Sequence, residues 1–343
     1  MLDLRSDTVT KPTEEMRRAM YEAEVGDDVY QEDPTVRLLE ETAADILGKE
    51  EALLVTSGTQ GNQIAVLNHC RPGQEIILEA DSHIFYYESG AVAALGGVQT
   101  RTIAGVRGVM DPDQVKNAIR GKDIHFPVTG LICIENTHNR AGGAVVPVEN
   151  MKKIYAVAQS HQIPVHIDGA RLFNAAEAAG VEVKDFAQYA DTVQFCLSKG
   201  LGAPIGSIIA GSTEFIQAAR KWRKMLGGGM RQAGVIAAPG LIALTRMKDR
   251  LGEDHANAKR LAEEIENIEG LQVDNKVETN IIIVNVKDLG VSSEEFVTQL
   301  ASEGVLVGAS GPTSVRCVTN YDVSASQIED AITAISRAAS KCR

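Results

Sequence analysis

The amino-acid sequence predicts an α/β fold, in which a large, mostly parallel sheet with helices on both faces is followed by a smaller C-terminal α/β domain. Two apolar, β-prone runs, at 163–168 and 192–199, each end abruptly in a charged side chain, which is typical of buried parallel strands. Helical stretches with capping residues separate the strand-like runs. With 343 residues, 44% of them hydrophobic, the chain can bury one large domain or two moderate ones.

The first predicted elements are an arm and two helices. The stretch 2–12 is polar, and taken alone it indicates an arm that lies on the protein surface. A helix is expected after Thr13, whose side chain is a good cap and is followed by two acids. A second, amphipathic helix is expected over 35–47, with Gly48 as its stop signal.

The segment 52–62 predicts a short strand, a turn of small residues and the start of a helix. Backbone N–H groups at a helix start point outward and carry partial positive charge, so Ser57, Gly58 and Thr59 can surround a phosphate group. The same pattern is also an ordinary strand-to-helix connection. Taken alone, the segment leaves both interpretations open.

Lys199 and Asp168 are the charged residues at two strand ends. The spacing, 199 − 168 = 31, leaves room for one helix and a second strand, and in a parallel sheet both side chains emerge at the same edge. A lone lysine there usually marks only where a strand meets water. Paired with a carboxylate it suits pyridoxal 5'-phosphate (PLP), because the lysine bonds to the cofactor aldehyde and the carboxylate keeps the pyridine nitrogen protonated. The PLP phosphate then becomes the better explanation for 57–59.

The histidines allow a metal alternative. Strand alternation places His166 on the same side as Asp168, so it is either a partner of that carboxylate or a satisfied core histidine. The rival interpretation is a zinc site built from His83, His125, His138 and His166. None of them has the i, i+4 spacing of a helical zinc motif, and no cysteine pair accompanies them. We predict no metal.

The second half of the chain predicts a further domain. A long helix from Gly240 to about Glu269 is expected to join residues 1–245, the arm and large PLP-binding domain, to residues 246–343, the small C-terminal domain. The basic segment 221–231 contains three consecutive glycines. Glycine loses more conformational entropy on folding than any other residue, so three in a row cost more than an ordinary surface loop requires. Arg316 lies in mid-strand among apolar neighbours, where a charge is expensive to bury without a partner.

Charge and cysteine usage exclude several classes of protein. The net charge of −12, spread without long runs of one sign, argues against nucleic acid as a partner. The five cysteines are scattered and form no C-x-x-C pair, as expected of core thiols in a reducing compartment. The first residues lack a signal-peptide pattern, and no stretch approaches the length of a bilayer span. We therefore expect a cytoplasmic protein with no membrane partner.

Four motifs occur in the order found in the L-threonine aldolases. They are Asp-Leu-Arg-Ser-Asp-Thr-Val-Thr at 3–10, Thr-Ser-Gly-Thr at 56–59, Asp-Gly-Ala-Arg at 168–171 and Ser-Lys-Gly-Leu at 198–201. The chain resembles the low-specificity type of this family over nearly its whole length. The resemblance implies the fold-type I architecture of PLP-dependent transferases, the aspartate aminotransferase superfamily, with a seven-stranded sheet in the large domain and PLP as the cofactor.

The resemblance implies roles for two histidines. His83 follows the third predicted strand, where such enzymes stack a planar side chain on the pyridine ring, and it can also accept the proton of a substrate hydroxyl. His125 is implied to point toward the same hydroxyl. The catalytic set is then Lys199, Asp168 and these two histidines, and the choice of base between the histidines stays open.

The resemblance also implies binding residues. The arm would line the active site, with Ser6 in contact with the substrate carboxylate or the cofactor. Arg316 would contact the substrate carboxylate. Arg171 would contact that carboxylate and the ring oxygen of the cofactor, and Arg231 the cofactor phosphate of a neighbouring subunit. Active sites shared in this way require an oligomer, and we expect a homotetramer arranged as a dimer of dimers, with a plain dimer as the alternative.

The implied activity is retro-aldol cleavage of L-threonine and L-allo-threonine, which are β-hydroxy-α-amino acids, to glycine and acetaldehyde. It would place the protein in threonine catabolism and glycine biosynthesis. A PLP enzyme breaks whichever bond to Cα it aligns, so β-elimination, racemisation and transamination are alternatives. From a different class, a catalytically silent PLP-binding regulator is a further alternative, although the sequence has no basic helix-turn-helix.

Overall fold

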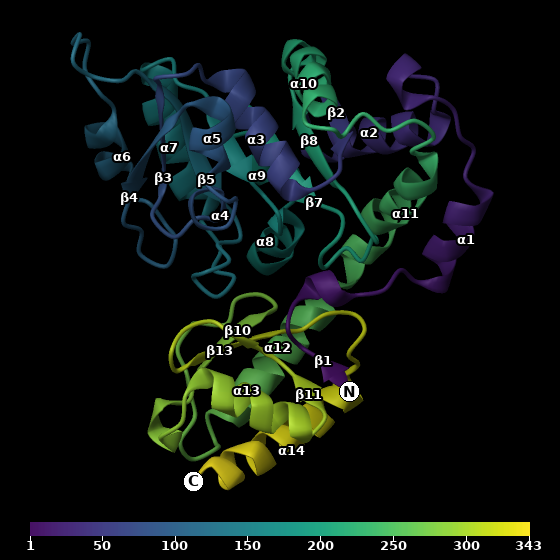
Figure 1. The fold of residues 1–343 in the computed structure, drawn as a ribbon, viewed down its shortest axis with the longest axis vertical. Helices are drawn as coiled ribbons and strands as arrows, with labels where there is room; N and C mark the ends of the chain where they lie inside the picture. The colour runs from purple at the N-terminus through teal and green to yellow at the C-terminus, as the bar shows by residue number, and fades with distance from the viewer.

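The computed structural model describes all 343 residues, and a seven-stranded sheet organises the larger part of the chain (Figure 1). The strands of this sheet are β2 (Glu51–Val55), β3 (Glu75–Glu79), β4 (Gln99–Ile103), β5 (Thr129–Glu135), β6 (Val165–Asp168), β7 (Thr192–Cys196) and β8 (Ser207–Gly211). Their order is β2-β8-β7-β6-β5-β3-β4, and only β8 runs antiparallel to its neighbours. The prediction of a mostly parallel seven-stranded sheet is therefore confirmed.

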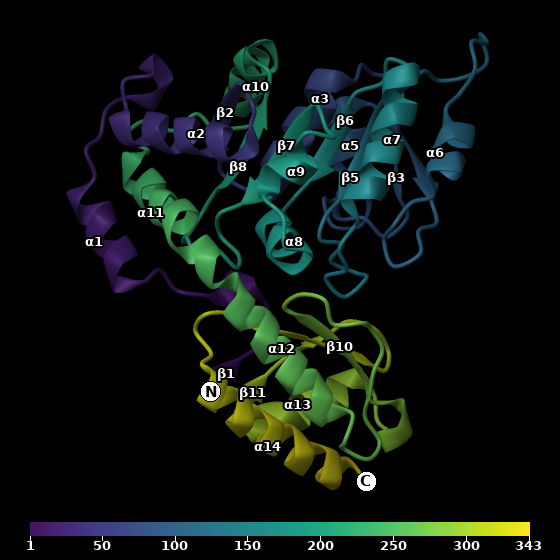
Figure 2. The same cartoon turned by 180° about the vertical axis from the view of Figure 1, so that it is seen from behind.

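Helices cover both faces of the large sheet (Figures 1 and 2). One face carries α3 (Gly58–His69), α5 (Ala91–Gly96) and α10 (Thr213–Met225), and the other carries α2 (Pro34–Leu47), α6 (Pro112–Ala118), α7 (Val148–Ser160), α8 (Leu172–Ala179) and α9 (Val183–Ala187). Alternate residues of one strand therefore enter different apolar clusters: Leu53 faces one side of the sheet and Leu54 the other. This explains why the core strands are apolar along their whole length.

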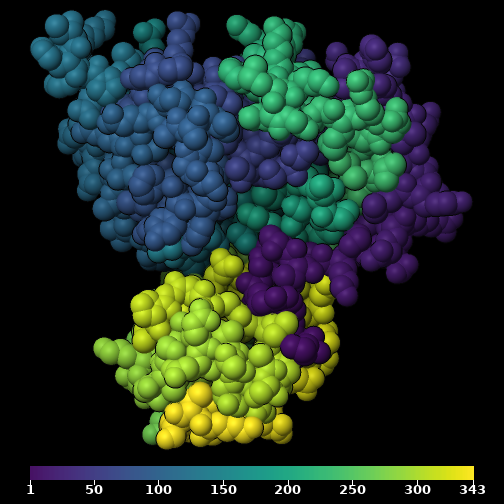
Figure 3. Space-filling model, viewed as in Figure 1, coloured from purple at the N-terminus to yellow at the C-terminus, as the bar shows by residue number.

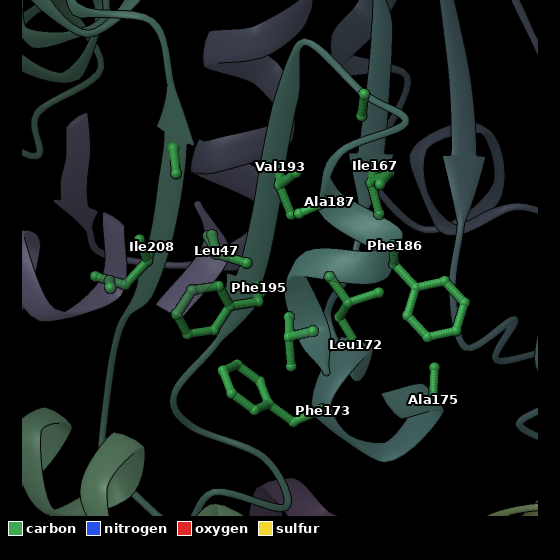
Figure 4. Packing of buried hydrophobic residues seen from close by; sticks show 14 of the residues in the cluster. Leu47, Ile167, Leu172, Phe173, Ala175, Phe186, Ala187, Val193, Phe195 and Ile208 are labelled. Carbon is green, nitrogen blue, oxygen red and sulfur yellow. The ribbon is translucent and has the colours of Figure 1, made fainter. Parts of the chain in front are cut away.

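The largest apolar cluster holds β6 and β7 in place (Figure 4). The rings of Phe173 and Phe195 meet edge to face with centroids 5.1 Å apart, and Phe186 is fully buried beside them. Burying one side chain of this size stabilises the fold by about 1.5–3 kcal/mol. The cluster therefore fixes the two strands whose ends carry Asp168 and Lys199.

The link between the two sheets is not one continuous helix. The structure has α11 (Gly234–Thr245) and α12 (Leu251–Ile265), separated by a 3-10 helix over Met247–Arg250. Arg246 leaves helical geometry, with φ −133° and ψ −49°, which redirects the chain into the second domain. The prediction of a single helix from Gly240 to Glu269 was wrong. The helical pattern of the sequence continues through the break, whereas the change of direction is required by the packing of the two domains.

The second sheet is small and antiparallel. Its order is β12 (Gly308–Ala309), β13 (Ser314–Val318), β10 (Ile281–Asn285) and β9 (Gln272–Val273). The helices α12, α13 (Ser293–Ser302) and α14 (Ala325–Cys342) supply most of the helical side chains in its apolar core.

The amino-terminal arm is tied to this small sheet domain. Its strand β1 (Leu2–Asp3) pairs in parallel with β11 (Val305–Leu306), and Leu4 is fully buried in the core of the small domain. In Figure 3 the arm lies across the top of the small domain, between it and the large one. The arm is thus partly buried instead of lying on the surface, because it fills the junction of the two domains.

The remaining helices are α1 (Glu14–Glu22) and the short α4 (His83–Tyr86). Thr13 caps α1 as expected, since its side chain accepts from the backbone N–H of Met16. No helix combines the length and the apolar character needed to cross a membrane.

Candidate active site

The carboxyl ends of the six strands that share one direction lie at one edge of the large sheet, and four of them lead to predicted site residues. Ser57 follows β2, His83 follows β3, Asp168 is the last residue of β6, and Lys199 follows β7. Ligands of open α/β sheets bind outside this edge. The small domain lies against the same edge, so residues from both domains can reach one ligand.

Two adjoining cavities occupy this edge. The first, of about 300 Å³, is lined by Ser57, Gly58, Thr59, His83 and Lys199 among others. The second, of about 420 Å³, is lined by Ser6, His83, Arg171, Lys199 and Arg316 among others. His83 and Lys199 line both cavities, so the predicted phosphate-binding segment and the predicted carboxylate-binding residues are neighbours of one amine.

Asp168 lies behind His83 in a buried hydrogen-bond network. Its Oδ2 accepts from the Asn62 side chain at 2.9 Å, and the Asn62 carbonyl oxygen is 3.0 Å from Nε2 of His166. His166 is fully buried, and burial lowers its pKa to about 4. It is therefore a neutral, satisfied core histidine that contacts Asp168 only through Asn62. Of the two alternatives for His166, the structure has the second.

The start of α3 has free backbone donors next to the first cavity. The Ser57 side chain caps the helix by accepting from the backbone N–H of Gln60, which leaves the first N–H groups of the helix without intrahelical partners. A Cβ on Gly58 would stand 2.9 Å from Sγ of Cys196 on β7. The glycine thus lets the turn approach the strand that leads to Lys199, and the donors fit a phosphate group.

Two guanidinium groups converge on the second cavity from different domains. Arg171 comes from the start of α8 and is 6% exposed, while Arg316 comes from β13 of the small domain. Burial and the neighbouring charge of Arg171 lower the pKa of Arg316. Two cations held close together in a half-buried pocket favour an anion such as a carboxylate between them.

Asp7 of the arm anchors one of these guanidinium groups. Its two carboxylate oxygens accept from Nε and Nη2 of Arg171 at 2.7 and 2.6 Å, and Asn280 of the small domain donates to the same carboxylate at 3.3 Å. Burial alone would raise the pKa of Asp7, but the Arg171 guanidinium outweighs burial and lowers it. The arm, the large domain and the small domain therefore meet at one carboxylate, which sequence analysis did not identify.

An Asp7→Ala variant is expected to lower the free energy of unfolding by about 3–5 kcal/mol, because it leaves a buried guanidinium without its partner. The pKa of Asp7 is depressed in the folded state, so the stabilisation is present above the unfolded pKa of about 3.9 and is lost as the pH falls through the lower, folded value. Urea unfolding of the wild type and of Asp7→Ala, at neutral and at acidic pH, measures this difference in the free energy of unfolding.

The matched control for this variant is Asp3→Ala, which removes an ion pair to Arg5 that is largely exposed. Its loss should be much smaller. Equal losses for the two variants, or a difference that persists at the acidic limit, would contradict the role of the buried pair.

His83 is held by a second residue that sequence analysis missed. Its Nδ1 lies 3.0 Å from Oε1 of Glu88, whose side chain is fully buried. Burial opposes the charged form of His83, but the hydrogen bond to Glu88 and the charge of Asp168 outweigh it and raise the pKa of His83. A glutamate five positions after a histidine is not a recognised sequence motif, so the contact between the two side chains is visible only in the folded structure.

Three predicted site residues line neither cavity within one chain: Asp168 is buried next to His83, and the other two lie elsewhere. His125 lies on an exposed loop, where its Nδ1 is 2.6 Å from Asp123. Arg231 is exposed and donates to Asp27 at 3.0 Å. Neither lines either cavity, so the roles given to them stay predictions that require a second subunit.

The four histidines of the zinc alternative have separate surroundings. His138 is buried 2.8 Å from Glu79, His166 pairs with Asn62, and His125 is exposed. The ligating atoms that do lie close together, within 4.8 Å of one another, are those of His83, Glu88 and Asp168. We treat this trio as an acid–base cluster, since each member has a hydrogen-bond partner that accounts for it.

Comparisons with known proteins agree over nearly the whole chain. The family model described as "Beta-eliminating lyase" matches residues 3–289. A probable low-specificity L-threonine aldolase 2 of Arabidopsis thaliana is 49% identical and covers 96% of this chain and 94% of its own. The low specificity L-threonine aldolase of Escherichia coli K12 is 43% identical, covering 96% and 97%. A solved structure of Leishmania major threonine aldolase superimposes with a TM-score of 0.86 at 18% identity, covering 99% and 100%.

Proposed function

Because this chain belongs to the β-eliminating lyase family and is a relative of the low-specificity L-threonine aldolases, we propose that it cleaves L-threonine and L-allo-threonine to glycine and acetaldehyde. The observation that carries the proposal is the meeting of an amine, an imidazole and two guanidinium groups, Lys199, His83, Arg171 and Arg316, around the adjoining cavities. The two guanidinium groups suit the carboxylate of a β-hydroxy amino acid and the imidazole suits its hydroxyl, while the Lys199 amine is available to the cofactor aldehyde.

The residues present fit PLP as the cofactor. Lys199 would provide an amine for its aldehyde, the buried Asp168 carboxylate would keep a proton on the pyridine nitrogen, and Ser57, Gly58 and Thr59 would bind the phosphate at the start of α3. When bound, PLP supplies an aromatic ring that accepts the electron pair of the breaking bond.

The substrate carboxylate is bound by Arg316, Arg171 and Ser6 in the second cavity. Asp7 holds two nitrogens of the Arg171 guanidinium, so the orientation of the remaining one is set before substrate arrives. Anchoring the carboxylate from two domains decides which bond to Cα is aligned for cleavage. Bond choice, and with it the reaction, therefore depends on the residues that bind the carboxylate and not on the cofactor alone.

His83 accepts the proton of the β-hydroxyl as the Cα–Cβ bond breaks. The ring lines both cavities, so it is within reach of groups bound in either. Burial opposes the charged ring, but the hydrogen bond to Glu88 and the charge of Asp168 raise the pKa of His83 above its usual value, which makes the ring a stronger proton acceptor. His125 is the second candidate for contact with the hydroxyl, from the exposed loop of another subunit.

The proposed assembly is a cytoplasmic homotetramer with shared active sites, acting in threonine catabolism and glycine biosynthesis. Arg231 is bonded to the loop that carries Tyr30: its side chain donates to Asp27, and its carbonyl oxygen accepts from the backbone of Asp28. Tyr30 is 71% exposed, so this region offers a cationic and an aromatic side chain to a second subunit. Arg231 then binds the cofactor phosphate across the interface. Light scattering on the eluting native protein measures the subunit number.

The experiment that tests the function is incubation of the purified, PLP-loaded protein with L-threonine and L-allo-threonine. We expect acetaldehyde and glycine in equal amounts, measured by aldehyde-coupled reduction and amino-acid analysis. D-threonine serves as the control and should give no aldehyde.

The family description gives one specific rival, β-elimination. That reaction would release ammonia and a keto acid from L-threonine instead of an aldehyde and glycine. Ammonia in place of acetaldehyde would therefore overturn the proposed reaction while leaving the cofactor assignment unchanged. Racemised or transaminated product would do the same.

A further inference from the structure

The two nitrogens of the His83 ring have different surroundings. Nδ1 lies 3.0 Å from the Glu88 carboxylate, which is completely buried. Nε2 has no hydrogen-bond partner in the chain, and the ring itself is 29% exposed and lines both cavities. One side of the imidazole is thus engaged by the protein, and the other is available to a ligand.

Glu88 itself is held rigidly by α3. Its Oε1 accepts from the Asn62 side chain at 2.7 Å, and its Oε2 accepts from Gln63 at 2.6 Å. The Asn62 amide nitrogen also donates to Asp168 at 2.9 Å, and the Asn62 oxygen faces Nε2 of His166. The Asn62 amide therefore cannot turn over without losing bonds to both carboxylates. Glu88 keeps one position, and His83 must adapt to it.

We propose that Glu88 is a positioning residue that holds a proton on Nδ1 of His83 and so leaves the Nε2 lone pair as the acceptor of the substrate hydroxyl proton. An ionised carboxylate only accepts hydrogen bonds, so the nitrogen facing it must carry hydrogen. The same carboxylate stabilises the imidazolium that forms when Nε2 takes up the proton. The assignment of the hydroxyl as the proton donor rests on the proposed function, whereas the tautomer does not.

The other charged groups around His83 do not substitute for Glu88. Asp168 raises the pKa of His83 and Lys199 lowers it, and both act through space. Glu135 accepts the backbone N–H of His83 at 2.6 Å and leaves the ring free. The Tyr87 ring is 5.6 Å away, centroid to centroid. Glu88 is thus the group that bonds directly to the imidazole.

The structure offers a variant that removes only the charge. In Glu88→Gln the new amide can donate to Oε1 of Gln63, a buried oxygen with no partner in the wild-type chain, once the Gln63 amide turns over. Its carbonyl oxygen then still accepts from His83. Glu88→Leu removes both the charge and the acceptor. The two variants separate stabilisation of the imidazolium from orientation of the ring.

The test uses magic-angle-spinning NMR of the PLP-loaded enzyme labelled with ¹⁵N-histidine, with His83→Asn to assign the signals. In the wild type we expect the neutral ring of His83 to carry its proton on Nδ1. Glu88→Gln should keep this tautomer and lower the pKa of His83 by about one unit or more. Glu88→Leu should lose the preference for Nδ1. The acid limb of the pH profile of kcat/KM should move to lower pH in Glu88→Gln by the same shift.

The matched control is Glu75→Gln, because Glu75 is also a fully buried carboxylate but lies at the other end of β3, paired with Arg120. It should leave the His83 signals unchanged. A wild-type proton on Nε2, or a His83 pKa that Glu88→Gln does not alter, would overturn the inference. The tautomer is measured without substrate, so a protein that shows it but does not cleave L-threonine would refute the proposed function and retain the positioning role of Glu88.

Discussion

A Lys199→Ala variant is expected to release acetaldehyde from L-threonine at least about 10³-fold more slowly than the wild type, since removal of a covalent nucleophile has effects of that order or larger. Lys199 lines both cavities, and its side-chain nitrogen has no hydrogen-bond partner in the chain. The amine is therefore free to bond to the cofactor. Stopped assays of aldehyde release measure the rate.

A second readout separates the covalent role of Lys199 from its charge. Borohydride reduction followed by peptide mass spectrometry should find the cofactor attached to Lys199 in the wild type and to no residue in Lys199→Ala. Lys199→Arg keeps a cation but not a nucleophilic amine, so it should be as inactive as the alanine variant. Lys49→Ala, which removes a half-buried lysine that donates to the Ala190 carbonyl, is the control. An active Lys199→Arg enzyme would refute covalent catalysis.

An Asp168→Asn variant is expected to keep its fold and lose turnover by about 10²–10³-fold, the usual effect of removing one preorganised electrostatic group. The Asp168 carboxylate is 2% exposed and accepts from Asn62 and from the backbone of Ala170. Asparagine preserves this volume and one accepting oxygen. It cannot balance a positive charge on a pyridine nitrogen, so the cofactor ring accepts electrons less readily. Steady-state kcat measures the loss.

The control for this variant is Asp191, which contacts β6 at the end opposite to Asp168. Asp191 accepts from the backbone N–H of Val165 at 2.7 Å, at the start of β6 and far from the cavities. Asp191→Asn should affect unfolding without changing kcat. Near-normal turnover in Asp168→Asn, with PLP bound, would remove the electron-sink role from this carboxylate.

Much of the site was predictable from the sequence because the relevant signals are local. A strand buried on both faces must be apolar, so the abrupt polar ends at Asp168 and Lys199 mark the edge of the sheet. Parallel pairing then brings those ends together. The small-residue turn at 57–59 was predictable for a similar reason, since it joins the end of a strand to the start of a helix.

The contacts that orient these groups were not predictable in the same way. Asp7 and Arg171 are 164 residues apart, and Asn62 and Asp168 are 106 apart. His166 shares the side of Asp168 by strand alternation, yet α3 inserts Asn62 between them. No periodicity in the sequence encodes such distant pairs, because they depend on how helices pack on the sheet.

The sequence by itself determined the α/β class, the parallel strands and the sheet edge at which both Lys199 and Asp168 lie, since apolar runs and turn residues act over a few positions. The tertiary structure decided how the arm enters the small domain, where the linking helix breaks, and which partners hold His83 and Arg171. Buried polar groups must find partners wherever packing places them, and those partners come from distant segments of the chain.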